Sequence, residues 1–239
     1  GRVERTLGEN LTVGVNGVVE EQSPTNYTLL GGDLKYDLKD RFTLLGEIGR
    51  SNTISGQGLA YKVESNLRPV SELSLKGYYR RVENGFFNVT QSGSGRELGT
   101  KKYGASGAYQ PGALTKFVTD FYRSEQDGAF GKVTLRSVSG GIEQGITSDL
   151  LTTLRVEDIT YDGRGPDTAR GAVATHSTLG TARLAYTLSD RLKLSAQHER
   201  NFGSDQDITK PNATALAAEF KLADPVSLQG QQKFYDGGG

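Results

Sequence analysis

The chain has 239 residues, with 28 basic and 28 acidic side chains, 32 glycines, and neither cysteine nor tryptophan. The balanced charge gives no indication of a nucleic-acid partner, and the lack of cysteine excludes disulfides and thiolate metal sites. The hydrophobic content of 35% is low for a soluble β-sandwich, and no apolar run is long enough for a transmembrane helix. Composition leaves a soluble glycine-rich β protein or a transmembrane β-barrel, whose wall needs no dry core.

Short polar turns divide the sequence at seven places. They are residues 8–10, 38–40, 68–71, 110–113, 147–149, 189–191 and 223–225. In the arms on both sides of each turn, apolar and polar residues alternate with the period of a β-strand. Seven hairpins predict an all-β protein with about 14 antiparallel strands, within a range of about 12–16. The uneven spacing of the turns argues against a propeller or a solenoid.

The connections at the opposite ends of the arms are longer and richer in glycine, asparagine, aspartate and serine. We expect them at 22–26, 51–56, 83–99, 125–130, 162–175 and 203–211. Short turns on one side and long loops on the other are typical of outer-membrane β-barrels.

The clearest hairpin lies within residues 178–202, TLGTARLAYTLSDRLKLSAQHERNF. Leu184 and Tyr186 share one face before the turn, and Leu192 and Leu194 share it after the turn. Each arm has about 10 residues, the length that a tilted strand needs to cross a bilayer. The hairpin therefore predicts one face toward lipid and one toward water.

Charged side chains of both signs occupy the second face of the arms. On a lipid-facing surface each charge would cost about 2–4 kcal/mol at mid-depth, whereas a wet lumen removes that cost. We therefore predict a lumen lined by Asp33, Lys35, Glu47, Lys62, Glu64, Glu72, Lys76, Arg80, Lys102, Lys116, Asp120, Arg155, Glu157, Arg183, Lys193, Glu199, Glu219, Lys221 and Lys233.

Four of the apolar rows end in an arginine on the side of the long loops: Arg50, Arg81, Arg123 and Arg200. Aromatic residues gather near both ends of the arms, as they do at the two interfaces of a membrane. Guanidinium groups suit phosphate, so these arginines are expected to contact the phosphorylated headgroups of lipopolysaccharide. The alternative is that each arginine reaches to water and binds nothing in particular.

The hairpins LKYDLKDRFTLLGEIGR, LAYTLSDRLKLSAQHER and AEFKLADPVSLQGQQKFY resemble those of Gram-negative outer-membrane β-barrel proteins, the porin-like group. The resemblance covers nearly the whole chain. It implies an antiparallel transmembrane barrel in the outer membrane of a bacterial cell, in contact with outer-membrane lipid and lipopolysaccharide.

One feature departs from that group, because the first arm runs into a short turn and the last arm runs away from one. Both ends of the chain then fall on the long-loop side. Three explanations are open. The chain is part of a larger barrel, or it is a rearranged or trimmed form, or residues 1–9 are a periplasmic lead-in rather than a strand. We treat residues 1–239 as a single β-barrel domain. The alternative is that they are a segment or a rearranged form of a larger barrel.

The predicted function is passive passage of ions or small polar solutes. Phe86 and Phe87, in the longest connection, either fold into the lumen as a constriction or pack at the loop base. The alternatives are a structural barrel that anchors or surrounds a partner, and a soluble or surface adhesin-like scaffold. Solubility without detergent separates the scaffold from the channel, and conductance separates the channel from the structural barrel.

No catalytic residue, cofactor or metal ligand is predicted. His198 falls on the lipid-facing side of its arm, and no G-x-S-x-G nucleophile motif accompanies it. Asp205 and Asp207 alternate like calcium ligands but lack the glycine and the distal glutamate of an EF-hand loop. We therefore expect no enzyme.

Overall fold

The computed structural model describes residues 1–22, 25–54, 56–87, 98–128, 131–164, 172–203, 212–224 and 226–236. The strands are β1 (Arg2–Leu7), β2 (Leu11–Gln22), β3 (Thr25–Leu38), β4 (Phe42–Thr53), β5 (Gly56–Val70), β6 (Leu73–Val82), β7 (Thr100–Tyr109), β8 (Thr115–Gly128), β9 (Gly131–Gly145), β10 (Leu150–Arg164), β11 (Ala172–Ser189), β12 (Leu192–Asn201), β13 (Ala213–Ala223) and β14 (Val226–Tyr235). The 3-10 turn η1 (Lys39–Arg41) joins β3 to β4. Among the described residues, no helix has the length and hydropathy of a membrane span.

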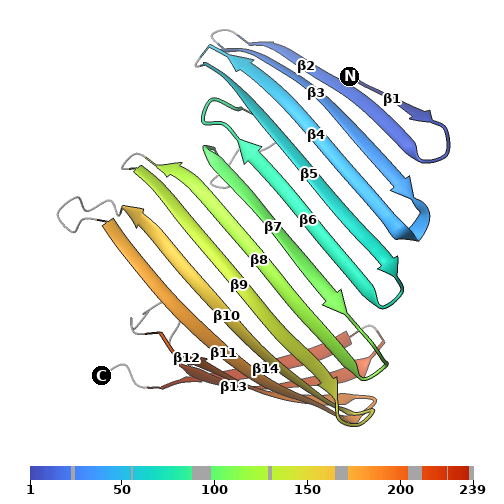
Figure 1. The fold of residues 1–239 in the computed structure, drawn as a ribbon, viewed down its shortest axis with the longest axis vertical. Helices are drawn as coiled ribbons and strands as arrows, with labels where there is room; N and C mark the ends of the chain where they lie inside the picture. The colour runs from blue at the N-terminus through green and yellow to red at the C-terminus, as the bar shows by residue number, and fades with distance from the viewer. Residues whose placement is uncertain are drawn as a thin grey trace. The chain divides into compact units, whose positions relative to one another are not determined.

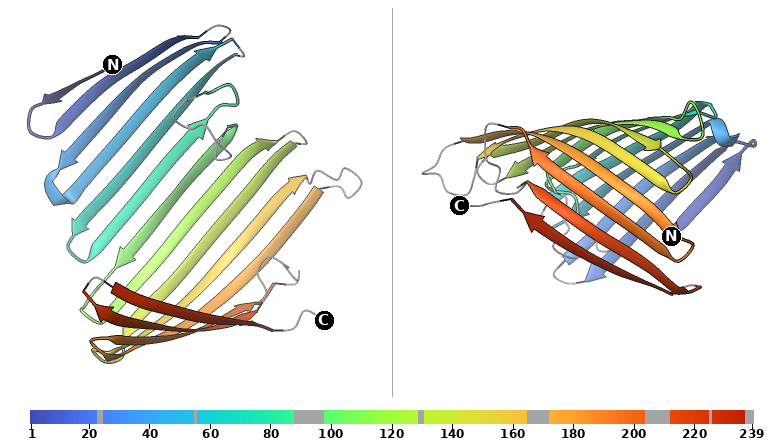
Figure 2. Two further views of the ribbon diagram at one scale, coloured as in Figure 1. Left: turned by 180° about the vertical axis from the view of Figure 1, so that it is seen from behind. Right: turned by 90° about the horizontal axis from the view of Figure 1, so that it is seen from below.

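The strands form a 14-stranded antiparallel sheet in which spatial order follows chain order from β1 to β14 (Figure 1). Neighbouring strands keep this order when the ribbon is seen from behind (Figure 2). The all-β prediction and the expected number of strands are therefore confirmed. Such a sheet results when every strand pairs antiparallel with its neighbours in the chain, whether the connection between them is a short turn or a longer loop.

The chain divides into two compact units. The first holds residues 1–106, 122–136 and 162–173, and the second holds 107–121, 137–161 and 174–239. Strands β1–β6 belong to the first unit, and β12–β14 belong to the second. The single domain over residues 1–239 stays a prediction.

All seven predicted turns occur between strands at or beside the expected residues. In the first, Gly8 has φ +68°, a left-handed conformation that glycine adopts without a Cβ penalty. Strand β1 pairs with β2 from Arg2 opposite Asn16 to Leu7 opposite Leu11. The interpretation of residues 1–9 as a lead-in is therefore wrong.

Three of the six connections that were expected to be long are not. Only two residues separate β2 from β3, β4 from β5, and β8 from β9. The strands continue through polar residues that the sequence pattern assigns to connections: Asn26 lies in β3 opposite Glu21, and Asn52 lies in β4 opposite Gln57. Backbone pairing does not require apolar side chains, so a strand extends wherever water can solvate its polar ones. The connections 83–99, 165–171 and 202–212 do separate their strands widely.

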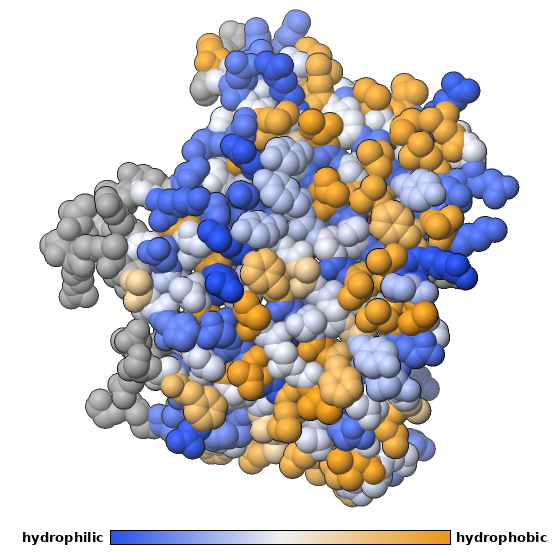
Figure 3. All heavy atoms as spheres, viewed as in Figure 1, coloured by the Kyte–Doolittle hydropathy of each residue, from blue (hydrophilic) through white to orange (hydrophobic). Residues whose placement is uncertain are grey.

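The two faces of the sheet differ in chemistry as predicted. Along β12, Leu192, Leu194 and Ala196 lie opposite apolar or small residues of β13, and the intervening Lys193 lies opposite Glu219. The apolar face is uncovered: Leu184 is 51% exposed, and Leu216 is 50% exposed. In Figure 3, hydrophobic side chains spread over the middle of the view, with hydrophilic ones gathered toward its sides.

Little of the chain forms a buried core. Among the described residues, the buried hydrophobic side chains are Tyr27, Val82, Ile159, Ala213 and Ala215. A soluble protein rarely exposes a continuous apolar surface while burying so little. The arrangement disfavours a soluble scaffold and suits a wall one sheet thick with lipid on its apolar face.

Candidate functional site

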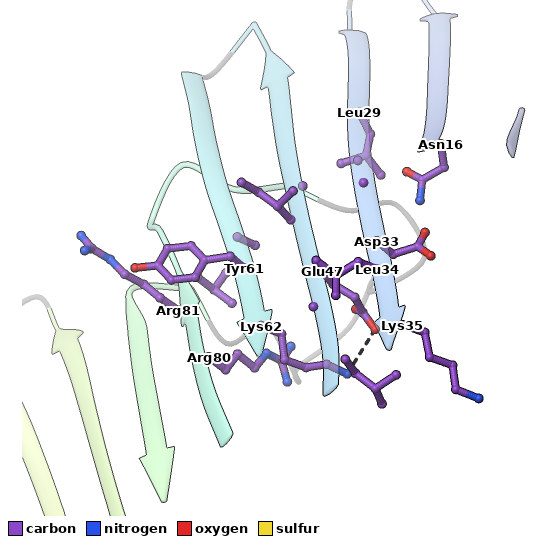
Figure 4. Close-up of a pocket in the computed structure, with 18 of the residues that line it drawn as sticks. Asn16, Leu29, Asp33, Leu34, Lys35, Glu47, Tyr61, Lys62, Arg80 and Arg81 are labelled. Atoms are coloured by element: carbon purple, nitrogen blue, oxygen red, sulfur yellow. Dashed lines mark ion pairs between the residues drawn. The ribbon is translucent and has the colours of Figure 1, made fainter. Parts of the chain in front are cut away.

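The polar face of the first unit carries its charged residues in cross-strand rows. Glu47 on β4 lies between Asp33 on β3 and Lys62 on β5, and Lys62 in turn lies opposite Arg80 on β6. Lys62 Nζ lies 3.2 Å from Glu47 Oε1, the ion pair drawn in Figure 4, and 3.5 Å from Glu64 Oε2. These are partly exposed pairs in a hydrated setting, where each contributes less than about 1 kcal/mol of stability.

A cavity of about 810 Å³ lies along strands β1–β6 in this unit. Its lining includes Arg2 together with Asp33, Glu47, Lys62 and Arg80. The last four are labelled in Figure 4. Arg2 on β1 joins the same surface by binding Asp33 at 3.0 Å and Glu4 at 2.8 Å. The result is a hollow lined by charges of both signs, which favours water, ions and small polar molecules.

Residues 83–87 leave β6 and turn back over the polar face of β3–β5. The Phe87 N–H donates to Ser51 Oγ at 2.7 Å, and the Tyr27 hydroxyl donates to the Phe87 carbonyl at 3.3 Å. The rings of Tyr27 and Phe87 meet edge to face, with centroids 5.5 Å apart. Ser51 is fully buried, and Tyr27 is nearly so. The segment is therefore held by specific contacts, and Phe86 lines the cavity.

Glycines make room for this segment. A Cβ on Gly58 would lie 2.1 Å from the Phe86 backbone nitrogen and 2.6 Å from its Cα. A Cβ on Gly49 would only touch the Phe86 ring, at 3.5 Å. The backbone of the segment thus approaches β5 more closely than any side chain at position 58 would allow.

The structure places Phe86 and Phe87 against strands β3–β5, and their role as a constriction stays a prediction. Both residues lie over the polar face, near the ends of β4 and β5 that adjoin the connection 54–55. The rest of the predicted constriction loop, residues 88–97, lies outside the described residues.

The second unit repeats the pattern of paired charges on its polar face. Lys116 Nζ lies 3.1 Å from Glu143, and Arg155 lies 3.4 Å from Asp120 and 2.8 Å from Ser139 Oγ. Farther along, Lys233 binds Glu199 at 3.2 Å across β13. Cross-strand pairs of this kind stabilise a wet sheet face modestly.

The structure places nearly all of the predicted lumen residues on this polar face. By strand register or by ion pairs they are Asp33, Lys35, Glu47, Lys62, Glu64, Lys76, Arg80, Lys116, Asp120, Arg155, Arg183, Lys193, Glu199, Glu219, Lys221 and Lys233. Glu157 joins them through its bond from Ser137 Oγ at 2.6 Å, and Lys102 through its alternation with Tyr103 in β7.

Glu72 is the exception. It lies in the two-residue turn between β5 and β6, so its assignment to the lumen is wrong. The strand β5 runs to Val70, and the turn therefore falls later than the sequence pattern placed it. A hydrogen bond from the Ser71 side chain, aided by the backbone N–H of Glu72 itself, lowers the pKa of the Glu72 carboxyl.

Several residues of the site were not predicted. Arg2, Glu4 and Glu143 follow the same alternation as their neighbours, so the strand pattern could have identified them. Tyr27, Ser51 and Gly58 could not be identified in this way, because their role depends on a segment about 30 or more residues away in the sequence folding back onto them.

The four arginines expected at lipid headgroups lie on the apolar face. Arg50 pairs with Leu30 and binds Gln57 Oε1 at 2.6 Å, and Arg200 stands 5.5 Å from the centre of the Phe202 ring. Arg81 lies opposite Tyr61. Arg123 shares Glu125 with Lys101, whose ammonium lies over the Tyr103 ring.

The weaker candidates gain no support. His198 Nδ1 is hydrogen-bonded to Thr214 Oγ1 at 3.0 Å, and His176 lies 2.7 Å from Asp158, both on the apolar side. Asp205 and Asp207 lie outside the described residues. Within the described part of the chain, no group of three or more histidine, aspartate or glutamate side chains is placed to hold a metal ion.

Neither a protein-family profile nor a curated protein sequence matches this chain. Among solved structures, the chain is similar to OmpF of Salmonella typhi in its complex with daunomycin, at a TM-score of 0.51 and 9% identity, over 94% of this chain and 88% of that one. A FadL homologue of Pseudomonas aeruginosa matches at a TM-score of 0.39 and 10% identity, covering 97% and 68% of the two chains. The translocator domain of the autotransporter NalP of Neisseria meningitidis matches at 0.28 and 16%, covering 97% and 81%.

The fold conclusion depends on the first of these similarities. Together with the antiparallel 14-stranded sheet and its two chemically distinct faces, it identifies the fold as that of a bacterial outer-membrane β-barrel.

Proposed function

We propose that the chain spans a bacterial outer membrane and forms a channel for passive passage of ions or small polar solutes. The observation that carries the proposal is the cavity on the polar face, lined by charges of both signs, while the opposite face exposes leucine and valine. Water in the lumen solvates the charges, and lipid covers the apolar side chains.

The segment at residues 83–87 is the proposed constriction. Phe86 and Phe87 lie over the charged face and reduce the hydrated cross-section where β4 and β5 end. With both signs of charge on the wall, we expect only a weak preference between cations and anions.

The test is single-channel recording of the refolded protein in planar lipid bilayers. Wild type is expected to give discrete conductance steps, and the double variant Phe86→Ala/Phe87→Ala is expected to give larger ones. Phe202→Ala is the matched control, because Phe202 is a 63% exposed aromatic residue beside Arg200 of the apolar face. Its conductance should equal that of wild type.

Other results would point elsewhere. Absence of conductance in both folded wild type and the double variant would favour a structural barrel that anchors or surrounds a partner. Monodispersity without detergent would favour a soluble scaffold instead. Equal conductance of wild type and the double variant would remove the constriction role but keep the channel.

A further inference from the structure

Three tyrosines from consecutive strands form a stack on the apolar face of the first unit. The ring centroids of Tyr61 and Tyr79 are 5.6 Å apart with an interplanar angle of 11°, and those of Tyr79 and Tyr103 are 6.3 Å apart at 15°. The hydroxyls of Tyr61 and Tyr79 lie 3.4 Å apart. The stack offers a flat surface, apolar on its faces and polar at its edge, near the strand ends on the side of the connection 83–99.

Two cationic side chains border this stack, and two more are joined to them through a carboxylate. Arg81 lies opposite Tyr61, and Lys101 Nζ lies 5.3 Å from the Tyr103 ring centre. Arg123 and Lys132 join Lys101 through a shared carboxylate: Glu125 lies 2.9 Å from Arg123, 2.5 Å from Lys132 and 4.0 Å from Lys101. We call Arg81, Lys101, Arg123 and Lys132 the basic cluster.

The basic cluster keeps an excess of positive charge. Its four cations contact two carboxylates, Glu125 and Glu83, and the Arg81–Glu83 distance is 4.0 Å. The Glu125 side chain is only 9% exposed, whereas Lys132 and Arg81 are half exposed. The buried carboxylate therefore holds three cations in one place, while Lys132 and Arg81 keep half of their side-chain surface exposed.

One donor of the cluster is unsatisfied. Arg123 Nε is buried and has no hydrogen-bond partner among the described residues. A buried donor without an acceptor is costly, so a movement of the Arg123 side chain that brings this donor to an anion at the cluster would be favourable. Cations that merely reach to water would not converge on a buried carboxylate beside a tyrosine stack.

We propose that the basic cluster and the tyrosine stack bind a phosphate group of lipopolysaccharide in the outer leaflet. Phosphate accepts charge-assisted hydrogen bonds from several cations at once, and guanidinium suits it in particular. The glucosamine ring and the first part of the acyl chains would lie over the tyrosines. Arg50 and Arg200 lie outside the cluster. Of the four arginines expected from the sequence to contact phosphate, the proposed site keeps Arg81 and Arg123 and adds Lys101 and Lys132.

The inference needs the membrane-spanning fold but not channel activity. The experiment therefore measures thermal unfolding by circular dichroism in phosphatidylcholine liposomes, with added lipopolysaccharide or an equal charge of phosphatidylglycerol, and with inorganic phosphate alone. For wild type we expect a dose-dependent rise in Tm with lipopolysaccharide, a clearly smaller one with phosphatidylglycerol and none with inorganic phosphate.

Two variants locate the effect. Arg81→Gln/Lys132→Gln is expected to weaken the apparent lipopolysaccharide affinity roughly tenfold or more, since each cation supplies a charge-assisted bond. Arg50→Gln/Arg200→Gln removes the same charge from the same face outside the cluster and should keep the wild-type affinity. If the first variant does not fold, Lys101→Gln replaces it, because Glu125 then retains its two shorter ion pairs.

The proposal is overturned if wild type shows no rise in Tm with lipopolysaccharide, or if both double variants lose affinity equally. An equal rise with phosphatidylglycerol would also overturn it, because the site would then recognise negative lipid charge in general. None of these results depends on conductance, so the proposed function is tested separately.

Discussion

Replacing Gly58 by alanine should release the Phe86–Phe87 segment from the polar face. The added Cβ would lie 2.1 Å from the Phe86 nitrogen, 2.3 Å from the Gly85 carbonyl carbon and 2.6 Å from the Phe86 Cα. All three atoms belong to the backbone, so no side-chain rotation relieves the overlap. Either the segment or β5 must move, and β5 is held by ladders to β4 and β6 on both sides.

The attraction that holds the segment is modest. Two hydrogen bonds, to Ser51 and from Tyr27, contribute about 1 kcal/mol each. Two half-buried phenyl rings add about 1 kcal/mol each, half of the value for full burial. Ordering even two or three loop residues costs a comparable amount, at about 1–2 kcal/mol per residue. The net docking energy is the small difference between these contacts and the cost of ordering the loop. One backbone overlap should therefore shift the segment to an undocked state.

Two measurements check this prediction. Single-channel conductance of Gly58→Ala should rise toward that of Phe86→Ala/Phe87→Ala, and chymotrypsin should cleave after Phe86 or Phe87 faster than in wild type. Gly140→Ala is the matched control, because a Cβ there meets nothing within 4 Å. Unchanged conductance and unchanged cleavage in a folded Gly58→Ala protein would refute the docking argument, as would an equal effect of Gly140→Ala.

Three further predictions follow from the two faces and from one turn. Leu194→Arg should impair membrane folding by about 2–4 kcal/mol, because Leu194 is on the apolar face, whereas Ser195→Arg on the polar face should be tolerated; similar losses in a folding titration would contradict the assignment of the faces. Glu47→Gln should shift the reversal potential in a salt gradient toward anions with less than about 1 kcal/mol change in stability, and an unaltered potential would mean that Glu47 does not face the permeating solution. Ser71→Ala should raise the pKa of Glu72 in an NMR titration, because it removes the hydrogen bond that lowers it. Since the folded pKa is lowered, the stabilisation by Glu72 is present above its unfolded pKa and lost as the pH falls through the folded value; an unchanged titration midpoint would show that Ser71 is not the cause.

The sequence by itself determined the features that depend on near neighbours in the chain. The seven turns and the division of β12 into an apolar row with Leu194 and a polar row with Ser195 were predictable, because the side-chain period of a strand is two and each turn has its own local signature. The same local reasoning placed strand ends wrongly where a strand continues through polar residues. Asn26 and Asn52 read as loop residues but belong to β3 and β4, since backbone pairing continues into water.

Only the tertiary structure decided which residues act together. Gly58 and Ser51 receive a segment that is about 30 residues away in the sequence, and Glu125 gathers Lys101 and Lys132 while Arg50, on the same face, remains apart. The alternation of side chains gives the sheet face on which each of these residues lies. It does not give the residue's depth, meaning its level along the strand relative to residues on neighbouring strands. Depth depends on the hydrogen-bonding register between neighbouring strands and on the path of the connections, and a one-residue shift of either would bring a different set of side chains together.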